Sequence, residues 1–174
     1  MTVIINFFAG PGAGKSTMAA SVYAMLKQNR VNAEFVPEFA KELTWRGEND
    51  KLDNQLLVTG TQLQRNLDLI GKVDYIITDS PVLLAAAYCK NHIEAAAVEH
   101  AARDLNRMPD VFAINYFVER EEDYQNAGRN QSKEEAIEID EFVRDLLSRQ
   151  REGYISIRRG EATAERITYD LLNI

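Results

Sequence analysis

A glycine-rich segment near the N-terminus constrains the fold of this chain more than any other feature. Residues 9–16, Ala-Gly-Pro-Gly-Ala-Gly-Lys-Ser, follow the apolar run of residues 3–8 and precede a helical pattern. Glycine has no Cβ, so such a loop can adopt positive φ angles and turn its backbone N–H groups toward phosphate oxygens. The start of a helix adds its dipole and its unpaired N–H groups. The segment therefore predicts a phosphate-binding P-loop between a strand and a helix.

Two side chains of this loop have separate expected roles. Lys15 is expected to reach the β- and γ-phosphates of ATP, and the Ser16 hydroxyl to ligate Mg²⁺. Ala9 stands where the motif has its first glycine, while Gly14-Lys15-Ser16 is intact. A glycine-rich turn with an exposed lysine is the alternative. The residues expected to bind the nucleotide are Gly10, Pro11, Gly12, Ala13, Gly14, Lys15, Ser16 and Thr17.

The bulk composition favours a single domain. The chain has 174 residues, of which 45% are hydrophobic and 27% are charged, which is enough for one core and too few for two. We therefore expect one domain over residues 1–174. With 20 basic and 27 acidic residues the net charge is −7, so the surface as a whole repels polyanions. The net charge does not exclude a local basic groove.

The single cysteine and the short apolar run near the N-terminus indicate the cellular compartment. Cys89, the only cysteine, lies in an apolar stretch and is interpreted as a small buried hydrophobe, which excludes a disulfide framework. The apolar run of residues 3–8 is too short for a membrane span or a signal peptide. We expect a soluble, cytoplasmic protein with no membrane partner. His92 and His100 form no metal set with the cysteine and are expected at the surface.

Short apolar runs alternate with helical patterns along the whole chain, and no repeat or flexible linker interrupts them. This alternation is typical of a parallel sheet covered by helices. We therefore predict an α/β fold, a three-layer P-loop NTPase architecture with a central five-stranded parallel sheet. The predicted strands cover residues 3–8, 33–37, 73–78, 111–118 and 154–158, and the predicted helices cover residues 15–28, 54–70, 82–91, 93–107, 133–150 and 162–172.

Asp79 follows the apolar run of residues 73–78, at the carboxyl end of a predicted buried strand. Ligands of open α/β sheets gather at that edge. There Asp79 is expected to hold Mg²⁺ through a water, or to accept a proton from an acceptor hydroxyl. The alternative is an N-cap aspartate for the helix that begins near Pro81.

Glu38 ends the second predicted strand, which we expect to lie beside the P-loop on the acceptor side. A carboxylate at this place can orient or deprotonate an attacking hydroxyl, so Glu38 is the expected general base. A solvated glutamate at the start of a helix is the alternative. Glu42, on the same helical face, is the fallback candidate.

Between about residues 119 and 132 the chain is charged, polar and without helical or strand period, and we interpret this segment as a lid. An arginine on such a lid stabilises the charge that moves during phosphoryl transfer. Arg129 is the preferred candidate, because acidic residues crowd the first half of the segment. Arg120 is the second candidate, with a surface ion pair as its alternative.

Four residues that follow the second strand or lie on the next helix are expected to line an acceptor pocket: Phe39, Trp45, Gln62 and Arg65. Trp45 either stacks on a flat ring at the lip of the cleft or plugs the core. Gln62 and Arg65 are three apart on one helical face and are placed to read a base edge, with exposed polar residues on a helix as the alternative.

Together, the P-loop, Glu38, the Asp79-Ser80-Pro81 motif and the arginine-bearing lid resemble the small P-loop nucleoside and nucleotide kinases, especially the AAA-like group that includes nicotinamide-riboside kinase domains. Residues 128–131, followed by residues 134–136 and 139–140, resemble phage-encoded kinases related to thymidylate kinase. Some of these phosphorylate 5-hydroxymethyluracil in viral DNA. The resemblance implies ATP and Mg²⁺ as cofactors, the cytoplasm of a phage host as the location, and a part in thymidine hypermodification.

Three functions stay open at this point. The first is transfer of the γ-phosphate of ATP to a hydroxyl of a pyrimidine, either 5-hydroxymethyl-deoxyuridine in phage DNA or a free nucleotide. The second is a kinase for a free small nucleoside such as a riboside. The third is a P-loop ATPase switch without a small-molecule acceptor. The sequence does not decide whether the chain forms a homodimer.

Overall fold

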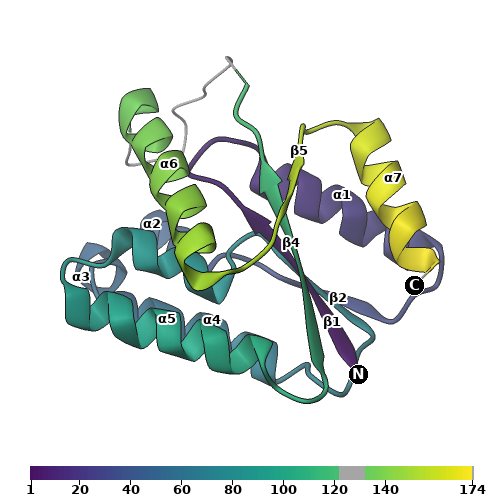
Figure 1. Ribbon diagram of the computed structural model, residues 1–174, viewed down its shortest axis with the longest axis horizontal. Helices are drawn as coiled ribbons and strands as arrows, with labels where there is room; N and C mark the ends of the chain where they lie inside the picture. The colour runs from purple at the N-terminus through teal and green to yellow at the C-terminus, as the bar shows by residue number, and fades with distance from the viewer. Residues whose placement is uncertain (122–131, 174) are drawn as a thin grey trace.

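The structure is a computed structural model that describes residues 1–121 and 132–173. Its centre is one parallel sheet of five strands in the order β2-β3-β1-β4-β5 (Figure 1). The predicted five-stranded parallel sheet is confirmed, and each strand begins and ends within two residues of its predicted bounds. The strands are β1 (Thr2–Phe8), β2 (Ala33–Val36), β3 (Tyr75–Thr78), β4 (Val111–Val118) and β5 (Ile155–Ile157).

The strand that pairs with the P-loop strand β1 on the side of β2 is β3, and β2 pairs with β3 at the edge of the sheet. The composition of the two strands explains the order. Ile76 and Ile77 of β3 are fully buried, as the centre of a parallel sheet requires, whereas β2 carries Glu34, which reaches Lys27 in a half-exposed ion pair.

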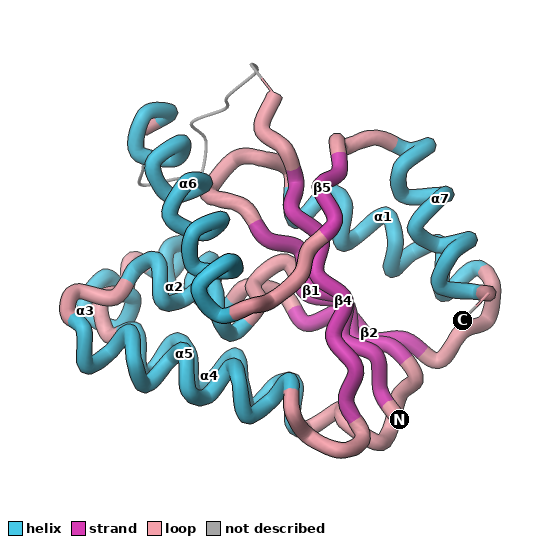
Figure 2. The backbone as a smooth tube through the Cα atoms, viewed as in Figure 1, coloured by secondary structure: helices cyan, strands magenta, loops and turns pink. Residues whose placement is uncertain are grey.

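Helices cover both faces of the sheet (Figure 2). On one face α1 and α7 pack together, and on the other α4 and α5 pack against each other and against the short helix η1. Asn91 caps α5, and a capping box formed by Ser132 and Glu135 begins α6. The elements are α1 (Lys15–Gln28), α4 (Gln55–Leu67), η1 (Val82–Tyr88), α5 (His92–Asn106), α6 (Lys133–Gln150) and α7 (Glu161–Leu172).

The helix predicted over residues 82–91 is the 3₁₀ helix η1 instead, and it ends at Tyr88. Packing accounts for the tighter winding. Val82, Leu83 and Leu84 are consecutive buried residues, and the single inward stripe of an α-helix does not bury three residues in a row.

Two short helices were not predicted between residues 38 and 54. The first, α2 (Phe39–Arg46), ends at Gly47, whose φ of 69° is the left-handed conformation that stops a helix. The second is the single turn α3 (Asn49–Leu52). The first of them, α2, carries Phe39 and Trp45 of the expected acceptor side, so this part of the chain has more regular structure than its sequence pattern indicates.

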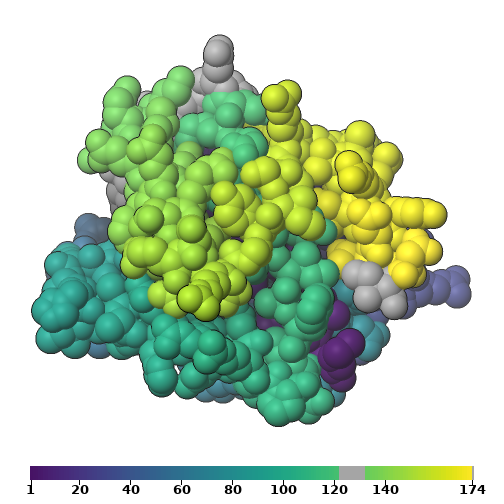
Figure 3. All heavy atoms as spheres, in the orientation of Figure 1, coloured from purple at the N-terminus to yellow at the C-terminus, as the bar shows by residue number. Residues whose placement is uncertain are grey.

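The space-filling view shows α6 in green and α7 in yellow on either side of the segment that carries β5 (Figure 3). Within the described residues, the longest apolar stretch of any helix falls short of what a bilayer crossing requires. His92 and His100 are exposed, as expected, whereas Cys89 is only partly buried. Burial nevertheless raises the pKa of the Cys89 thiol to about 11, so the thiol is protonated at neutral pH.

Candidate active site

The P-loop takes the backbone conformation that its glycines were expected to allow. Gly12 has a φ of 81° and Gly14 a φ of 102°, both in the left-handed region. Ala9 is fully buried at the exit of β1, where a small residue is sufficient. Gly10 is needed for a different reason, because a Cβ there would lie 2.5 Å from the carbonyl oxygen of Ala136 on α6. Gly12 and Gly14 are therefore required by the backbone conformation of the loop, and Gly10 by its close packing against α6.

Lys15 is buried at the start of α1 with only 9% of its surface exposed, so the exposed-lysine alternative is wrong. Its Nζ donates a hydrogen bond to the carbonyl oxygen of Gly10 at 2.8 Å. Burial lowers the pKa of Lys15, and the carboxylates of Glu38, Asp79 and Asp140 oppose that shift. The ammonium group is therefore surrounded by carboxylates of three different elements.

Asp79 follows β3 and is 3% exposed. Its Oδ1 atom is buried and has no hydrogen-bond partner within the described part of the chain. The N-cap alternative is wrong, since η1 begins after Pro81 and has no side-chain cap. A buried carboxylate oxygen without a partner is costly unless a ligand or a cation completes it. The position therefore fits a Mg²⁺ ion that binds together with phosphate oxygens.

The described residues alone form no complete metal site. No group of three histidine, cysteine, aspartate or glutamate side chains comes together among residues 1–121 and 132–173. Mg²⁺ commonly takes one or two protein oxygens and completes its shell with waters and phosphate. Asp79 and the Ser16 hydroxyl, in the first turn of α1, match that pattern.

Glu38 lies between the end of β2 and the start of α2, next to the strand that ends in Asp79. Its side chain is partly buried and makes no capping bond to α2, although the residue occupies the N-cap position. Burial raises the pKa of Glu38 above the usual range, the Lys15 ammonium opposes this shift, and the Asp79 carboxylate adds to it. A carboxylate with a raised pKa is suited to take up a proton.

Three of the four expected acceptor residues come together beside Glu38. The Gln62 side chain is buried, so the exposed alternative is wrong; its Oε1 accepts from the Phe39 backbone N–H at 3.2 Å. Its Nε2 donates to the Thr78 hydroxyl at 3.4 Å. The Arg65 guanidinium lies 5.1 Å from the centre of the Phe39 ring and donates to the Pro37 carbonyl oxygen.

Two further candidates lie on this side, Trp45 from the expected pocket and Glu42 as the fallback base. Trp45 is 70% exposed near the end of α2, so it does not plug the core. Glu42, the fallback base, accepts from Arg65 at 2.9 Å, and this hydrogen bond lowers the pKa of Glu42. A paired carboxylate of low pKa is a weaker base than Glu38.

Arg120 is bound into the protein instead of lying at the surface, so the surface-ion-pair alternative is wrong. Its Nε donates to Asp140 Oδ2 at 2.7 Å, and its Nη1 donates to the Pro11 carbonyl oxygen at 2.7 Å. Asp140 was not singled out as a site residue. The signal was present, because Asp140 falls on the apolar stripe of α6 between Ala136 and Val143. The preferred lid arginine, Arg129, lies outside the described residues, as do residues 122–131 of the proposed lid.

The segment after β5 also touches the P-loop. The Arg159 side chain lies against Gly14, where its Cδ would be 3.0 Å from an added Cβ. Arg159 Nε donates to Glu121 at 2.6 Å, and the Gly160 N–H donates to the Met18 sulfur. The loop ends after β1, β4 and β5 therefore meet at one place.

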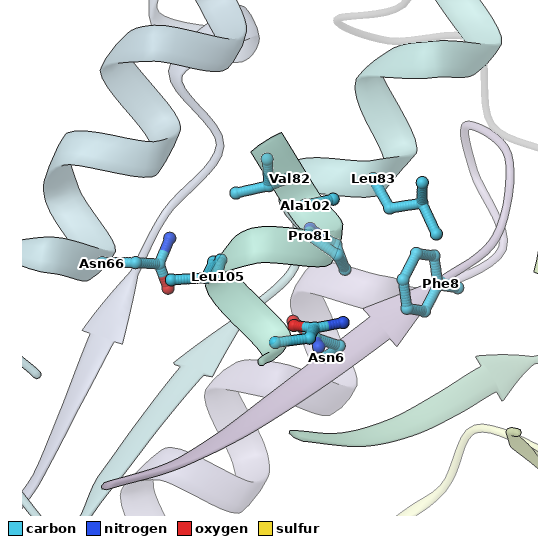
Figure 4. A pocket seen from close by; sticks show the side chains of 9 residues that line it. Asn6, Phe8, Asn66, Pro81, Val82, Leu83, Ala102 and Leu105 are labelled. Atoms are coloured by element: carbon cyan, nitrogen blue, oxygen red, sulfur yellow. The ribbon is translucent and has the colours of Figure 1, made fainter. Parts of the chain in front are cut away.

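A small cavity lies apart from these groups, between β1, η1 and α5. Its volume is about 10 Å³, and Asn6, Phe8, Asn66 and Leu105 are among its lining residues (Figure 4). This volume suits at most one water molecule. It is not a nucleotide pocket, so the candidate site is the edge of the sheet above the P-loop.

With this geometry in place, comparison with known proteins identifies the family. The family described as AAA domain matches residues 4–166. The chain belongs to this AAA-domain family. No curated protein matches the sequence of this AAA domain.

Two solved structures share the fold of this AAA domain. Thymidylate kinase from Ehrlichia chaffeensis has a TM-score of 0.62 and 14% identity, over 99% of this chain and 98% of that one. Deoxyadenosine kinase from M. mycoides has a TM-score of 0.55 and 14% identity, over 98% of this chain and 100% of that one. The predicted α/β P-loop fold is thereby confirmed.

Proposed function

We propose that this AAA domain is an ATP- and Mg²⁺-dependent phosphotransferase whose acceptor is a hydroxyl of a nucleoside-type molecule. One observation carries the proposal. Two carboxylates, Glu38 and Asp79, follow neighbouring strands and both interact electrostatically with the buried Lys15 at the P-loop. A carboxylate beside the phosphate end of a P-loop can accept the proton of an attacking hydroxyl, and in this proposal Glu38 has that role.

On the donor side, the residues of the P-loop hold the phosphates. The backbone N–H groups that follow Gly12, at the start of α1, would bind phosphate oxygens. Lys15, which donates to the Gly10 carbonyl oxygen, would turn part of its hydrogen bonding to the phosphates. Ser16 and Asp79 would hold Mg²⁺. When bound, that ion neutralises charge on the β- and γ-phosphates.

On the acceptor side, Glu38 takes the proton. The acceptor oxygen forms a bond to the γ-phosphorus, the bond from that phosphorus to the β,γ-bridging oxygen breaks, and ADP leaves with the electron pair. The hydroxyl proton moves to the Glu38 carboxylate. Because burial raises the Glu38 pKa, the proton is accepted near neutral pH more readily than by an exposed glutamate.

The acceptor class is supported by the residues around Glu38. Phe39 carries an aromatic ring beside Glu38, Gln62 of α4 accepts from the Phe39 backbone N–H, and the Arg65 guanidinium lies by the Phe39 ring. The two kinases of the same fold are named for a nucleoside and a nucleotide, which agrees with this class. The more specific acceptor is 5-hydroxymethyl-deoxyuridine in DNA. It is supported by the sequence resemblance alone.

A transfer assay tests the proposal. The protein is incubated with Mg²⁺ and ATP labelled at the γ-phosphate, together with deoxyadenosine, thymidine, thymidylate, nicotinamide riboside or DNA that contains 5-hydroxymethyluracil. Label should appear on a hydroxyl of at least one of these acceptors and should be absent with the Lys15→Ala variant. Hydrolysis of ATP with no labelled acceptor would overturn the proposal and favour an ATPase switch.

A further inference from the structure

We propose that Arg120 and Asp140 form a positioning pair that fixes the Gly10–Pro11 part of the P-loop and keeps the Asp140 charge from repelling a bound triphosphate. Neither side chain contacts the substrate in this proposal. The inference rests on the proposed function, because it takes ATP as the ligand of the P-loop. It replaces the expectation that Arg120 stabilises the transferred phosphate directly.

The contacts of Asp140 are the first argument. Asp140 lies on α6 and is 8% exposed. Its Oδ1 accepts from the Gly10 N–H at 2.5 Å, and its Oδ2 accepts from Arg120 Nε at 2.7 Å. The Gly10 N–H is therefore occupied by the protein, and phosphate must be held by the N–H groups that follow.

The contacts of Arg120 are the second argument. All three of its guanidinium nitrogens donate hydrogen bonds: Nε to Asp140, Nη1 to the Pro11 carbonyl at 2.7 Å, and Nη2 to the Ala136 carbonyl at 3.2 Å. Its side chain is 10% exposed. A guanidinium held on each nitrogen has a fixed position, unlike an arginine that must move to a phosphate in the transition state.

Close packing is the third argument. Besides the Ala136 carbonyl, an added Cβ at Gly10 would meet Asp140 Oδ1 at 3.1 Å and Arg120 Nη2 at 3.2 Å. The first turns of α6 and the end of β4 therefore press on the same peptide of the P-loop. The pair connects the P-loop, the end of β4 and α6. Gly10 and Asp140 are 130 residues apart in the sequence.

Charge explains why both partners are needed. A carboxylate beside the P-loop would repel the phosphates of ATP, and the Arg120 guanidinium compensates it at hydrogen-bond distance. Loss of Arg120 alone leaves a buried, uncompensated anion at the phosphate site. Loss of both residues removes the anion together with its partner.

A double-mutant cycle on the full chain separates this role from direct contact. The Kd of ATP, kcat at saturating ATP and the melting temperature are measured for Arg120→Ala, Asp140→Ala and the double variant. The Kd should rise about tenfold or more for Arg120→Ala and about threefold for Asp140→Ala. The double variant should resemble Asp140→Ala, and its kcat should stay within about threefold of the wild type.

Arg144→Ala is the matched control. Arg144 also joins α6 to the end of β4, through an ion pair with Glu119 and a guanidinium 3.7 Å from the Phe117 ring centre, but it does not touch the P-loop. It should lower the melting temperature and leave the Kd of ATP unchanged. Should Arg120→Ala fail to fold, Arg120→Lys takes its place, because it keeps the charge and loses the three-way hydrogen bonding.

The outcomes distinguish the two proposals. A double variant as weak as Arg120→Ala, or one whose kcat falls about 10³-fold, would show that Arg120 acts on the phosphate itself and would overturn the positioning pair. Wild-type ATP affinity in Arg120→Ala would overturn it as well. If the wild-type protein does not bind ATP, the proposed function fails instead.

Discussion

In the proposed function, the donor side of the site presents backbone groups, and the acceptor side presents side chains. The P-loop offers N–H groups whose directions are set by Gly12 and Gly14, and α6 holds its entrance in place. Across from it, Glu38, Gln62 and Arg65 come from the end of an edge strand and from α4. A backbone site is encoded by a few adjacent residues, whereas a side-chain site depends on elements that meet only in the folded protein. The two sides should therefore respond differently to substitution.

The largest effect is expected from the donor side. Lys15→Ala removes the buried ammonium that faces the phosphates, and phosphoryl transfer should fall below detection. ATP binding should weaken at the same time, as measured by calorimetry. Lys27→Ala is the control, since Lys27 lies in the last turn of α1 in a half-exposed ion pair and should leave both quantities unchanged. Full transfer activity in Lys15→Ala would contradict the donor-side assignment.

Glu38→Gln should separate the two sides. ATP binding should be retained, because Glu38 lies outside the P-loop, while transfer should fall about 10²-fold through loss of the proton acceptor. Glu42→Gln is the comparison, because Glu42 is bonded to Arg65 and has a lowered pKa. Greater damage from Glu42→Gln than from Glu38→Gln would assign the base to Glu42.

The pH dependence of transfer follows from Glu38. The base acts when it is deprotonated, so transfer should fall about tenfold per pH unit below the Glu38 pKa, which burial raises above the usual glutamate range. Stability should move in the opposite sense. A raised pKa favours the protonated folded state, so this contribution is full at low pH and is lost as pH rises through the raised value. The pH dependence of transfer and of stability is measured from initial rates and melting temperatures of the wild type and Glu38→Gln. A fall in rate that begins only at the ordinary glutamate pKa would contradict the assignment.

A smaller effect is expected from Gln62→Leu. This change removes the acceptor for the Phe39 N–H and the donor to the Thr78 hydroxyl, so the KM for the acceptor should rise about tenfold. The Kd of ATP should not change. Gln64→Leu, an exposed neighbour on the same helix that bonds only to Asp68 among the described residues, is the control. Equal effects of the two substitutions would show that Gln62 does not belong to the acceptor side.

Trp45→Ala should have the smallest effect. Since Trp45 is 70% exposed, the free energy of unfolding should change by less than about 0.5 kcal/mol. If its ring stacks on the acceptor, KM should rise about fivefold, the equivalent of about 1 kcal/mol. Tyr169→Ala, an exposed aromatic on α7, is the control for both measurements. An unchanged KM would remove Trp45 from the acceptor pocket.

The contrast between a backbone site and a side-chain site also explains which features could be predicted from the sequence. The P-loop, α1 and the five strands follow from local patterns, and their predicted bounds agree closely with the structure. Asp79 is buried where expected, because its position depends only on the strand that precedes it. These features need no knowledge of contacts between distant residues.

Features that depend on contacts between distant residues were harder to predict from the sequence. The position of β2 at the edge is decided by competition between strands for the centre of the sheet, which a strand pattern alone does not rank. The surroundings of Arg120 depend on Asp140, twenty residues further along the chain. The helices α2 and α3 have eight and four residues, too few to show a helical period.

The place of β2 in the sheet also bears on local unfolding. β2 has four residues and hydrogen-bonds to a single neighbouring strand, β3, whereas β1 is held between β3 and β4. Outer strands with few partners open at a lower free-energy cost than central ones. Transient opening at this edge would carry Glu38 out of reach of the nucleotide while the central strands keep the phosphate cradle formed. Heat inactivation of such a protein would begin with loss of the acceptor's base, well before the sheet itself melts.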